Sequence, residues 1–383
     1  MPDLATATQI SCGSSPATEV WLGGTKVWPV VTMGFEIEFT LSGGFSINSD
    51  FDYIAGIENT DAVVYHLDNT GLTTEIFRRN IEGLVSCSLS PGFNSSSGKL
   101  LIISRYISGG GYRQRVDCYN NDNNNFSTPV LIRDEIVGVL AMATNYSGDV
   151  LVVADASDAK IYKFENDAWG LKQTLNFRAT RISIDSSGNT IVLADPAYYV
   201  PFAGSSAGRC FIYELSGSQW QQTALFQGVD WFDNLGITAS ITPDGSQVAV
   251  GAKHVSSANN STTGSFIATK KLLANGSYSW SKTASFRDGV ITYSRGIVSL
   301  NSPFFAIGIA MSRQRYIENS TEYYNPYICN VYEYSGNWTK ISGDIPFTHN
   351  DQSVPAIKIN ESGDRLAIYK NYPTAETLFY KKT

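Results

Sequence analysis

A short pattern of apolar and polar positions recurs along most of the chain. Each unit begins with a short strand and passes through a turn rich in Gly, Asn, Asp and Ser into an apolar strand, and two further strands follow a variable loop. The unit is clearest over residues 179–228, where TRISID, TIVLAD, GRCFIYEL and WQQTALFQG follow one another. Repeated short strands rich in β-branched and aromatic residues predict an all-β repeat fold.

The two ends of the chain carry complementary fragments of this unit. Six complete units precede a last one, Pro355 to Lys381, which has three strands and lacks the fourth. Near the other end, Gly34 to Leu41 alternates apolar and polar residues as a strand without a unit of its own. We therefore predict a seven-bladed β-propeller over residues 34–383, in which this N-terminal strand completes the last blade and removes two free edges.

The turn between the first two strands of a unit carries a glycine wherever its sequence is fullest. These glycines are Gly148, Gly188, Gly245 and Gly363. Because tight hairpins need a backbone with positive φ, we expect that conformation at each of them.

Composition narrows the range of functions. The net charge is −7 and no basic stripe is present, which disfavours nucleic acid as a partner. No stretch approaches 18 apolar residues and the first residues lack the pattern of a secretion signal, so we expect folding in a cytoplasm without membrane insertion. Cys12, Cys87, Cys118, Cys210 and Cys329 are far apart and form no ligand-spaced pair, which predicts reduced, partly buried thiols.

The segments ITPDGSQVAVGAKH and GRCFIYEL resemble the FG-GAP and integrin-type propeller repeats. Calcium-binding members of that family carry alternating carboxylates in their turns, but TNYSGD, DSSGN, TPDGS and NESGD have too few of them. One segment, SIDSSGNT, is similar to the Asp box of sialidase-like propellers, although its Trp is missing. We expect neither a metal nor another cofactor.

No motif in the chain assembles a catalytic centre. His66, His254 and His349 fall in different units without a nearby Cys or spaced carboxylate. An H-E-x-x-H helix and a P-loop are missing from the sequence. The G-x-S-x-G match GSSAG, residues 204–208, lies in a loop that leads into a predicted strand, whereas a nucleophile elbow joins a strand to a helix. A propeller brings distant residues together around its axis, so an enzyme remains an alternative, but we predict a non-enzymatic protein.

Residues 1–33, ahead of the repeats, contain the string VWLGGTKVWP. It predicts a small hairpin that turns at Gly23-Gly24 and is too small to be stable without a partner surface. The string resembles a short element near the N-termini of tail- and fibre-associated structural proteins of tailed bacteriophages. That resemblance implies a docking extension, with Trp21, Leu22, Gly23, Gly24, Val27, Trp28 and Pro29 as candidate contacts to other virion proteins. The alternative is that the two tryptophans cover the outside of this chain's own propeller.

The longest loops of the units connect their second and third strands. They should lie on the face of the ring opposite the one from which the N-terminal extension leaves. Their candidate contact residues for a protein or a glycan are Tyr198, Tyr199, Phe202, Tyr316, Tyr323 and Tyr324, because tyrosine offers a large contact area at low entropic cost. Ordinary surface aromatics without a ligand are the alternative.

These observations together favour a structural protein of a phage virion, assembled in the host cytoplasm. It would be a tail, fibre-adaptor or capsid-appendage component that contacts other virion proteins and a host-surface glycan or receptor. The alternative is a glycan-binding or carbohydrate-active propeller that acts on cell-surface polysaccharide.

Overall fold

The computed structural model describes the backbone continuously from residue 46 to residue 255, except for residues 69–72, 230 and 232. Shorter described segments lie on either side: 11–12, 15–16, 20–22, 25–28, 35–42, 265–286, 293–295, 297–301, 304–310, 316–318, 321–323, 327–335, 337–342, 345–347, 356–360, 362–370 and 376–382. Within these segments the regular structure consists of β-strands.

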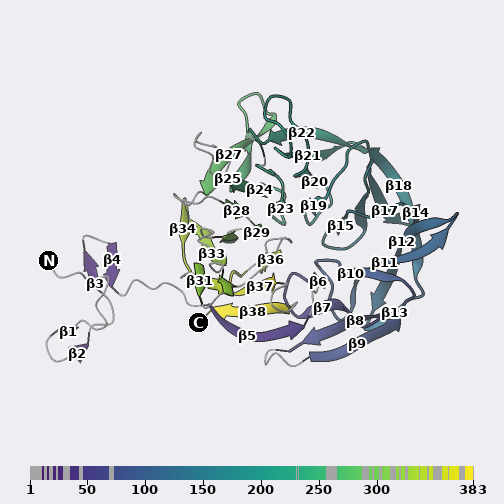
Figure 1. Ribbon diagram of the computed structural model, residues 1–383, viewed down its shortest axis with the longest axis horizontal. Coiled ribbons are helices and arrows are strands. Elements are labelled where there is room, and N and C mark those ends of the chain that lie inside the picture. Colours follow the sequence, from purple (N-terminus) through teal and green to yellow (C-terminus); the bar gives the residue numbers. More distant parts are fainter. Residues whose placement is uncertain are drawn as a thin grey trace.

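The strands form a β-propeller, in which antiparallel sheets stand around a central axis (Figure 1). One sheet contains β6 (Ser46–Ile47), β7 (Tyr53–Glu58), β8 (Asp61–Leu67) and β9 (Thr73–Asn80). The next contains β10 (Leu84–Leu89), β11 (Ser97–Ser108), β12 (Gly111–Asp122), β13 (Asn125–Phe126) and β14 (Val130–Ile136). The third contains β15 (Ala141–Thr144), β16 (Val150–Ala154), β17 (Ala159–Glu165) and β18 (Ala168–Leu175).

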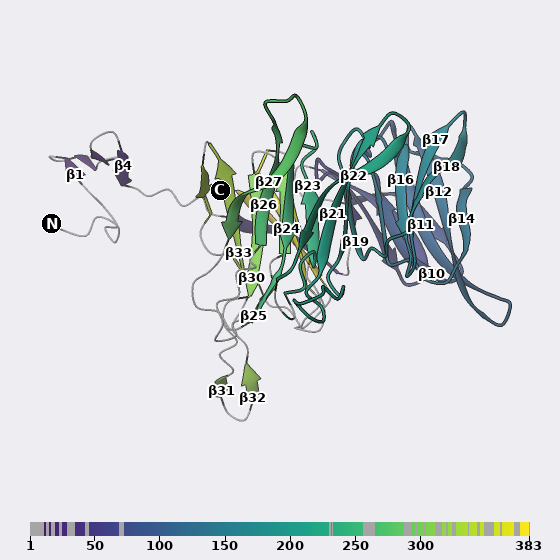
Figure 2. The same ribbon diagram turned by 90° about the horizontal axis from the view of Figure 1, so that it is seen from above.

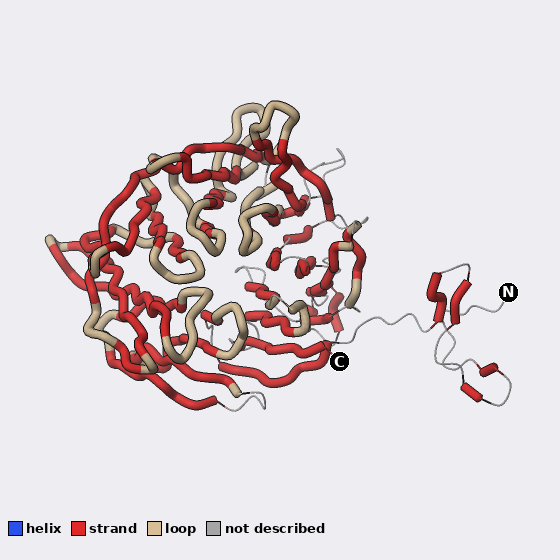
Figure 3. The backbone as a smooth tube through the Cα atoms, turned by 180° about the vertical axis from the view of Figure 1, so that it is seen from behind, coloured by secondary structure: helices blue, strands red, loops and turns tan. Residues whose placement is uncertain are grey.

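The sheets from the second half of the chain continue the ring. One contains β19 (Arg181–Ile184), β20 (Thr190–Asp195), β21 (Arg209–Ser216) and β22 (Gln219–Gln227). Another contains β23 (Thr238–Ile241), β24 (Gln247–Gly251), β26 (Ser265–Leu272) and β27 (Tyr278–Phe286). Beyond it, β29 (Ile297–Asn301), β30 (Phe304–Ala310), β33 (Tyr327–Tyr334), β34 (Trp338–Lys340) and β35 (Ile345–Phe347) form one sheet. Figure 3 shows strands around the circumference and loops converging toward the centre.

A last sheet joins the two ends of the sequence, as predicted. It contains β36 (Ala356–Ile359), β37 (Arg365–Lys370), β38 (Glu376–Lys382) and β5 (Phe35–Ser42). The N-terminal strand β5 runs antiparallel to β38, with Glu376 opposite Ser42 and Lys382 opposite Phe35. The predicted pairing of the N-terminal strand with the C-terminal fragment is therefore confirmed.

The turn after the inner strand of a sheet is held by a recurring hydrogen bond. The side-chain oxygen of the first turn residue accepts a hydrogen bond from the backbone N–H five residues later. Asn145 accepts from Val150 at 2.9 Å, and Asp185 accepts from Thr190 at 3.0 Å. The same contact links Thr242 to Gln247 at 3.0 Å and Asn360 to Arg365 at 2.9 Å. This contact explains why Asn, Asp or Thr recurs at that position, since each has an acceptor at short reach.

The turn glycines adopt the conformation that the sequence predicts. The φ angles of Gly148, Gly188, Gly245 and Gly363 are 73°, 79°, 71° and 67°. At Gly188 there is a second requirement, because a Cβ atom would lie 2.7 Å from Val150 Cγ2 in the preceding sheet. Glycine therefore permits both the turn itself and the close approach of neighbouring sheets.

These turns also bond to one another around the axis through their main chains. The donor and acceptor pairs are Ser49 N to Pro91 O at 2.7 Å, Gly92 N to Tyr146 O at 2.9 Å, Tyr146 N to Ser186 O at 3.4 Å, and Ser186 N to Pro243 O at 2.8 Å. At the seam between the last sheet and the first, the Lys358 ammonium donates to the carbonyls of Ile47 and Asn48. Burial lowers the pKa of Lys358 to about 8. This belt of contacts keeps adjacent sheets in register on one face of the ring.

Apolar side chains fill the space between adjacent sheets. Between the first two sheets, for example, Tyr53 and Val64 pack with Phe93, Leu100 and Ile102. Cys87, Cys118, Cys210 and Cys329 are free and buried in such interfaces, which confirms the prediction for these four. The side chain of Cys12 lies outside the described residues. Burial raises the pKa of the Cys210 thiol to about 12, so this thiol is not poised to react near neutral pH.

A largely buried ion pair connects the second and third sheets. Arg133 Nη2 on β14 lies 2.6 Å from Asp155 Oδ2, and only 11% and 13% of the two side chains are exposed. Burial by itself raises the pKa of Asp155, but hydrogen bonds from Ser157, Asp158 and Arg133 outweigh it and lower the pKa to about 2. The carboxylate therefore stabilises the fold in its charged form.

Replacing Asp155 with Asn is expected to lower the free energy of unfolding by about 2 kcal/mol near pH 6, which matches the size of the pKa shift. The folded-state pKa lies below the unfolded value of 3.8, so this stabilisation is present above about pH 4. It is lost as the pH falls toward 2. Urea denaturation of both proteins across this range measures the difference, and a difference that stays constant with pH would contradict the assignment.

Candidate functional site

The predicted contact loop of the β19–β22 sheet is folded onto the segment that leads into the next sheet. Asn234 N donates to Ser206 O at 2.9 Å, and Leu235 N donates to Ala207 O at 2.9 Å. Gly208, with φ of +83°, allows this approach because a Cβ atom there would lie 2.4 Å from Leu235 O. The loop and the segment therefore form one rigid unit.

Apolar and aromatic side chains stand out from this unit. Tyr199, Val229 and Trp231 are 58%, 54% and 64% exposed, and Phe202 is fully exposed. Trp231 lies against Gly204, where a Cβ atom would come within 2.2 Å of the indole Nε1. Phe202 has φ of +69°, a backbone conformation that costs energy for a bulky residue and is concentrated at functional sites. We call Tyr199, Phe202, Val229 and Trp231 the aromatic platform.

Tyr198 lies at the base of the same loop. The guanidinium of Arg209 lies 3.3 Å from the centre of the Tyr198 ring and 4.3 Å from that of Phe177. Tyr198 is half-buried and packs against a small cluster formed by Val200, Ala203 and Ala207. Of the three aromatics predicted in this loop, Tyr199 and Phe202 therefore face solvent, whereas Tyr198 supports the loop from below.

The predicted tyrosines of the other long loop lie on a separate hairpin. The strands β31 (Tyr316–Glu318) and β32 (Thr321–Tyr323) pair so that Tyr316 is opposite Tyr323. Figure 2 shows this hairpin projecting from one face of the ring, while the turn between β26 and β27 points away on the other face. Tyr324 and the side chains of Tyr316 and Tyr323 lie outside the described residues.

The N-terminal string forms the predicted hairpin. The strands β3 (Val20–Leu22) and β4 (Thr25–Trp28) pair with Leu22 opposite Thr25 and Trp21 opposite Lys26. Val27 lies within β4, whereas Gly23, Gly24 and Pro29 lie outside the described residues. With the two-residue strands β1 (Ser11–Cys12) and β2 (Ser15–Pro16), this hairpin lies beside the ring and takes no part in its sheets (Figure 1).

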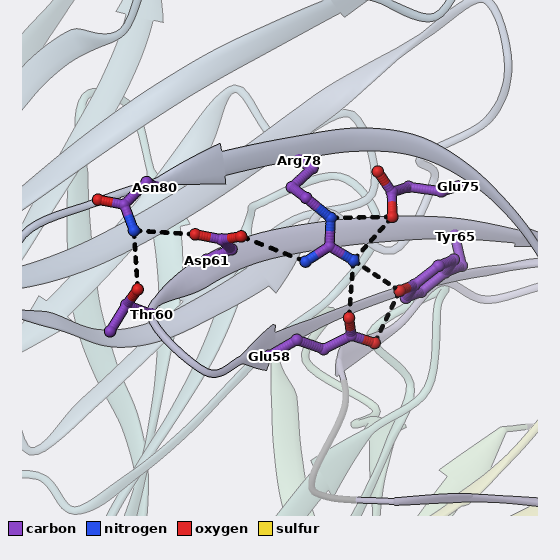
Figure 4. Close-up of polar contacts among 7 residues, drawn as sticks. All are labelled: Glu58, Thr60, Asp61, Tyr65, Glu75, Arg78 and Asn80. Carbon is purple, nitrogen blue, oxygen red and sulfur yellow. Dashed lines mark hydrogen bonds and ion pairs between the residues drawn. The ribbon is translucent and has the colours of Figure 1, made fainter.

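The densest group of charges lies within the β6–β9 sheet (Figure 4). The Arg78 guanidinium lies 2.7 Å from Glu58, 2.7 Å from Glu75 and 3.3 Å from Asp61. Tyr65 donates to Glu58 at 2.7 Å, and its pKa rises to about 12 through burial and this hydrogen bond. Each of these groups has a partner in the cluster, which links the three outer strands of one sheet.

Among the described side chains, no group of three or more His, Cys, Asp and Glu residues is arranged to hold a metal ion. His66 packs against Tyr53, with ring centres 4.9 Å apart. In the same part of the chain, no helix has the length and apolar character needed to cross a membrane.

A further cleft lies elsewhere, between the first two sheets, and has a volume of about 1140 Å³. The residue pattern alone did not predict this site. The signal that could have found it is the run RYISGGGYRQR, residues 105–115, which concentrates Arg and Tyr around a glycine turn.

Comparisons with known proteins identify the fold. No protein-family model and no curated protein matches the sequence. Among solved structures, the crystal structure of the tricorn protease is similar with a TM-score of 0.56 and 12% identity over 91% of this chain. Hsv2 from Kluyvelomyces marxianus is similar with a TM-score of 0.51 and 12% identity over 86% of this chain. This chain spans 34% of the tricorn protease chain and 89% of the Hsv2 chain. At such low identity, the likeness shows the β-propeller fold alone.

Proposed function

We propose that this chain is a non-enzymatic structural protein of a tailed-bacteriophage virion. In this proposal residues 1–33 dock onto another virion protein, and residues 34–383 form a seven-bladed propeller that presents contact surfaces to a protein or to the host. The hairpin of β3 and β4 carries the proposal, because a two-stranded ribbon beside the ring needs a partner surface to be stable. The resemblance of VWLGGTKVWP to the phage element supports a virion protein as that partner.

The aromatic platform supports the presenting role of the propeller. Fully exposed Phe202 stands on the loop and largely exposed Trp231 on the following segment, and backbone hydrogen bonds join the two. Large aromatics held by a rigid scaffold are typical anchors of protein interfaces, because little conformational entropy is lost when a partner binds. The platform is therefore the surface that we assign to protein contact.

Mass spectrometry of virions from the phage that encodes the chain tests the proposal. The full-length chain is expected in the particles, and a variant without residues 1–33 is expected to remain in the host lysate. The double substitution Trp21→Ala and Trp28→Ala should reduce incorporation in the same direction. Absence of the chain from virions, or incorporation that is unchanged by the deletion, would exclude the docking role.

A further inference from the structure

The cleft between the first two sheets is bounded by two segments. Residues 79–85, from the end of β9 through the linker to the start of β10, form one wall, and the β11–β12 hairpin forms another. The two walls are joined, since Arg105 N donates to Gly83 O at 2.7 Å. Gly83 has φ of +67°, and a Cβ atom there would lie 2.0 Å from Arg105 O, so the linker is held against the hairpin. The cleft is therefore preformed.

Polar groups of the cleft are held in fixed orientations. Arg115 donates to both carboxylate oxygens of Asp117, at 2.7 Å and 2.6 Å. The Tyr106 hydroxyl donates to Asp134 at the rim. Side chains that are already oriented by such contacts can bind a ligand without a further loss of rotamer freedom.

Two arginines of the cleft keep their hydrogen-bond donors available. The guanidinium of Arg79 lies 5.4 Å from the centre of the Tyr119 ring, and that of Arg105 lies 5.5 Å from the centre of the Tyr112 ring. Neither guanidinium has a carboxylate partner among the residues that the structure describes. Each guanidinium therefore lies over an aromatic ring of the lining, and its N–H groups are not used by a carboxylate.

The charges of the lining balance one another, which bears on the kind of ligand. The lining contains three arginines and three carboxylates: Arg79, Arg105, Arg115, Glu82, Asp117 and Asp134. Such a lining offers both donors and acceptors without selecting a charged ligand. Tyr112 and Ile107, which are 65% and 74% exposed, add apolar surface at the same place.

A peptide is the less suitable occupant. Extended peptides commonly bind by adding a strand to a free sheet edge. Here β11 pairs with β12 throughout and with β10 as far as Ser104, and β12 pairs with β14 from Gln114 onward. The edges left free at the cleft, residues 106–108 and 111–113, are shorter than a typical strand of about five or six residues. A sugar fits this lining better. Its hydroxyl groups need both hydrogen-bond donors and acceptors, and its apolar C–H faces pack on aromatic rings.

We propose that this cleft binds a neutral oligosaccharide. The proposal extends the host-contact role described above by naming a ligand class. It depends on the cleft and not on the N-terminal hairpin.

An array of immobilised oligosaccharides, with neutral glucose-, galactose- and mannose-based members beside carboxylated and sulfated ones, tests the proposal with the purified full-length chain. We expect retention by neutral members that persists in high salt. For the strongest of them, Tyr112→Ala should weaken binding by about tenfold or more in calorimetry. Tyr112→Phe, which keeps the ring, should retain most of the affinity.

Tyr278→Ala is the matched control, because Tyr278 is 59% exposed on a distant sheet. It should leave both the affinity and the melting temperature unchanged, and Tyr112→Ala should leave the melting temperature unchanged. Retention of charged glycans only, equal affinities of Tyr112→Ala and Tyr278→Ala, or no retained glycan would each overturn the proposal. Absence of the full-length chain from virions, with glycan binding intact, would count against the docking role alone.

Discussion

Deleting residues 1–42 is expected to destabilise the propeller by several kcal/mol, whereas deleting residues 1–33 should leave its free energy of unfolding nearly unchanged. The longer deletion removes β5 and leaves β38 as an unpaired edge. Each backbone hydrogen bond lost from this ladder contributes roughly 0.5–1.5 kcal/mol net. The closing sheet then keeps β36, β37 and β38 but no longer joins the ends of the chain. Thermal and urea denaturation of the two truncated proteins measure the difference.

A peptide can test whether the pairing itself is responsible. A synthetic strand covering residues 34–44, added in excess to the protein that lacks residues 1–42, should raise its melting temperature because it binds only the folded ring. A scrambled peptide of the same composition should not. Equal stability of the two truncated proteins would show that closure by β5 contributes little.

Replacing Phe93 with Ala is expected to lower the free energy of unfolding by about 3–5 kcal/mol. Phe93 is fully buried between the first two sheets, with ring centres 5.3 Å from Tyr53 and 6.0 Å from Phe126. Its neighbours are themselves held in the interface, so the cavity would not close completely. Urea denaturation measures the loss.

The chain supplies a matched control in Phe202→Ala. The same atoms are removed from a residue that is fully exposed on the aromatic platform, so stability should change by no more than about 0.5 kcal/mol. If both substitutions had the same effect, the burial assigned to Phe93 would be wrong.

The sequence predicted the propeller fold and its closure because both depend on local signals. Gly188 and its equivalents indicate hairpins through the conformation that they require, and the alternation in Phe35–Ser42 indicates a strand without a neighbour in sequence. Only one predicted repeat unit lacked a fourth strand, so the partner of this segment followed by elimination.

The sites were less predictable because they depend on how separate segments pack. Tyr198 and Tyr199 are neighbours of the same residue type, so the sequence does not tell which of them is exposed. The packing of Arg209 over Tyr198 distinguishes the half-buried ring from the exposed one. The cleft likewise requires Arg79 to meet Tyr119, and these residues come from different sheets. Residue spacing carries no information on such contacts, since they arise from the approach of neighbouring sheets.

The placement of β5 has a mechanical consequence if the N-terminal hairpin holds the chain on a particle. The extension continues directly into Phe35, the end of β5 that lies opposite Lys382. A pull between the particle and a ligand bound to the ring would be transmitted through β5. The hydrogen bonds of an antiparallel ladder lie perpendicular to the strands. The load would be shared in shear by the whole ladder, which resists force better than a ladder that opens one bond at a time. The strand that closes the ring would thus also serve as its tether.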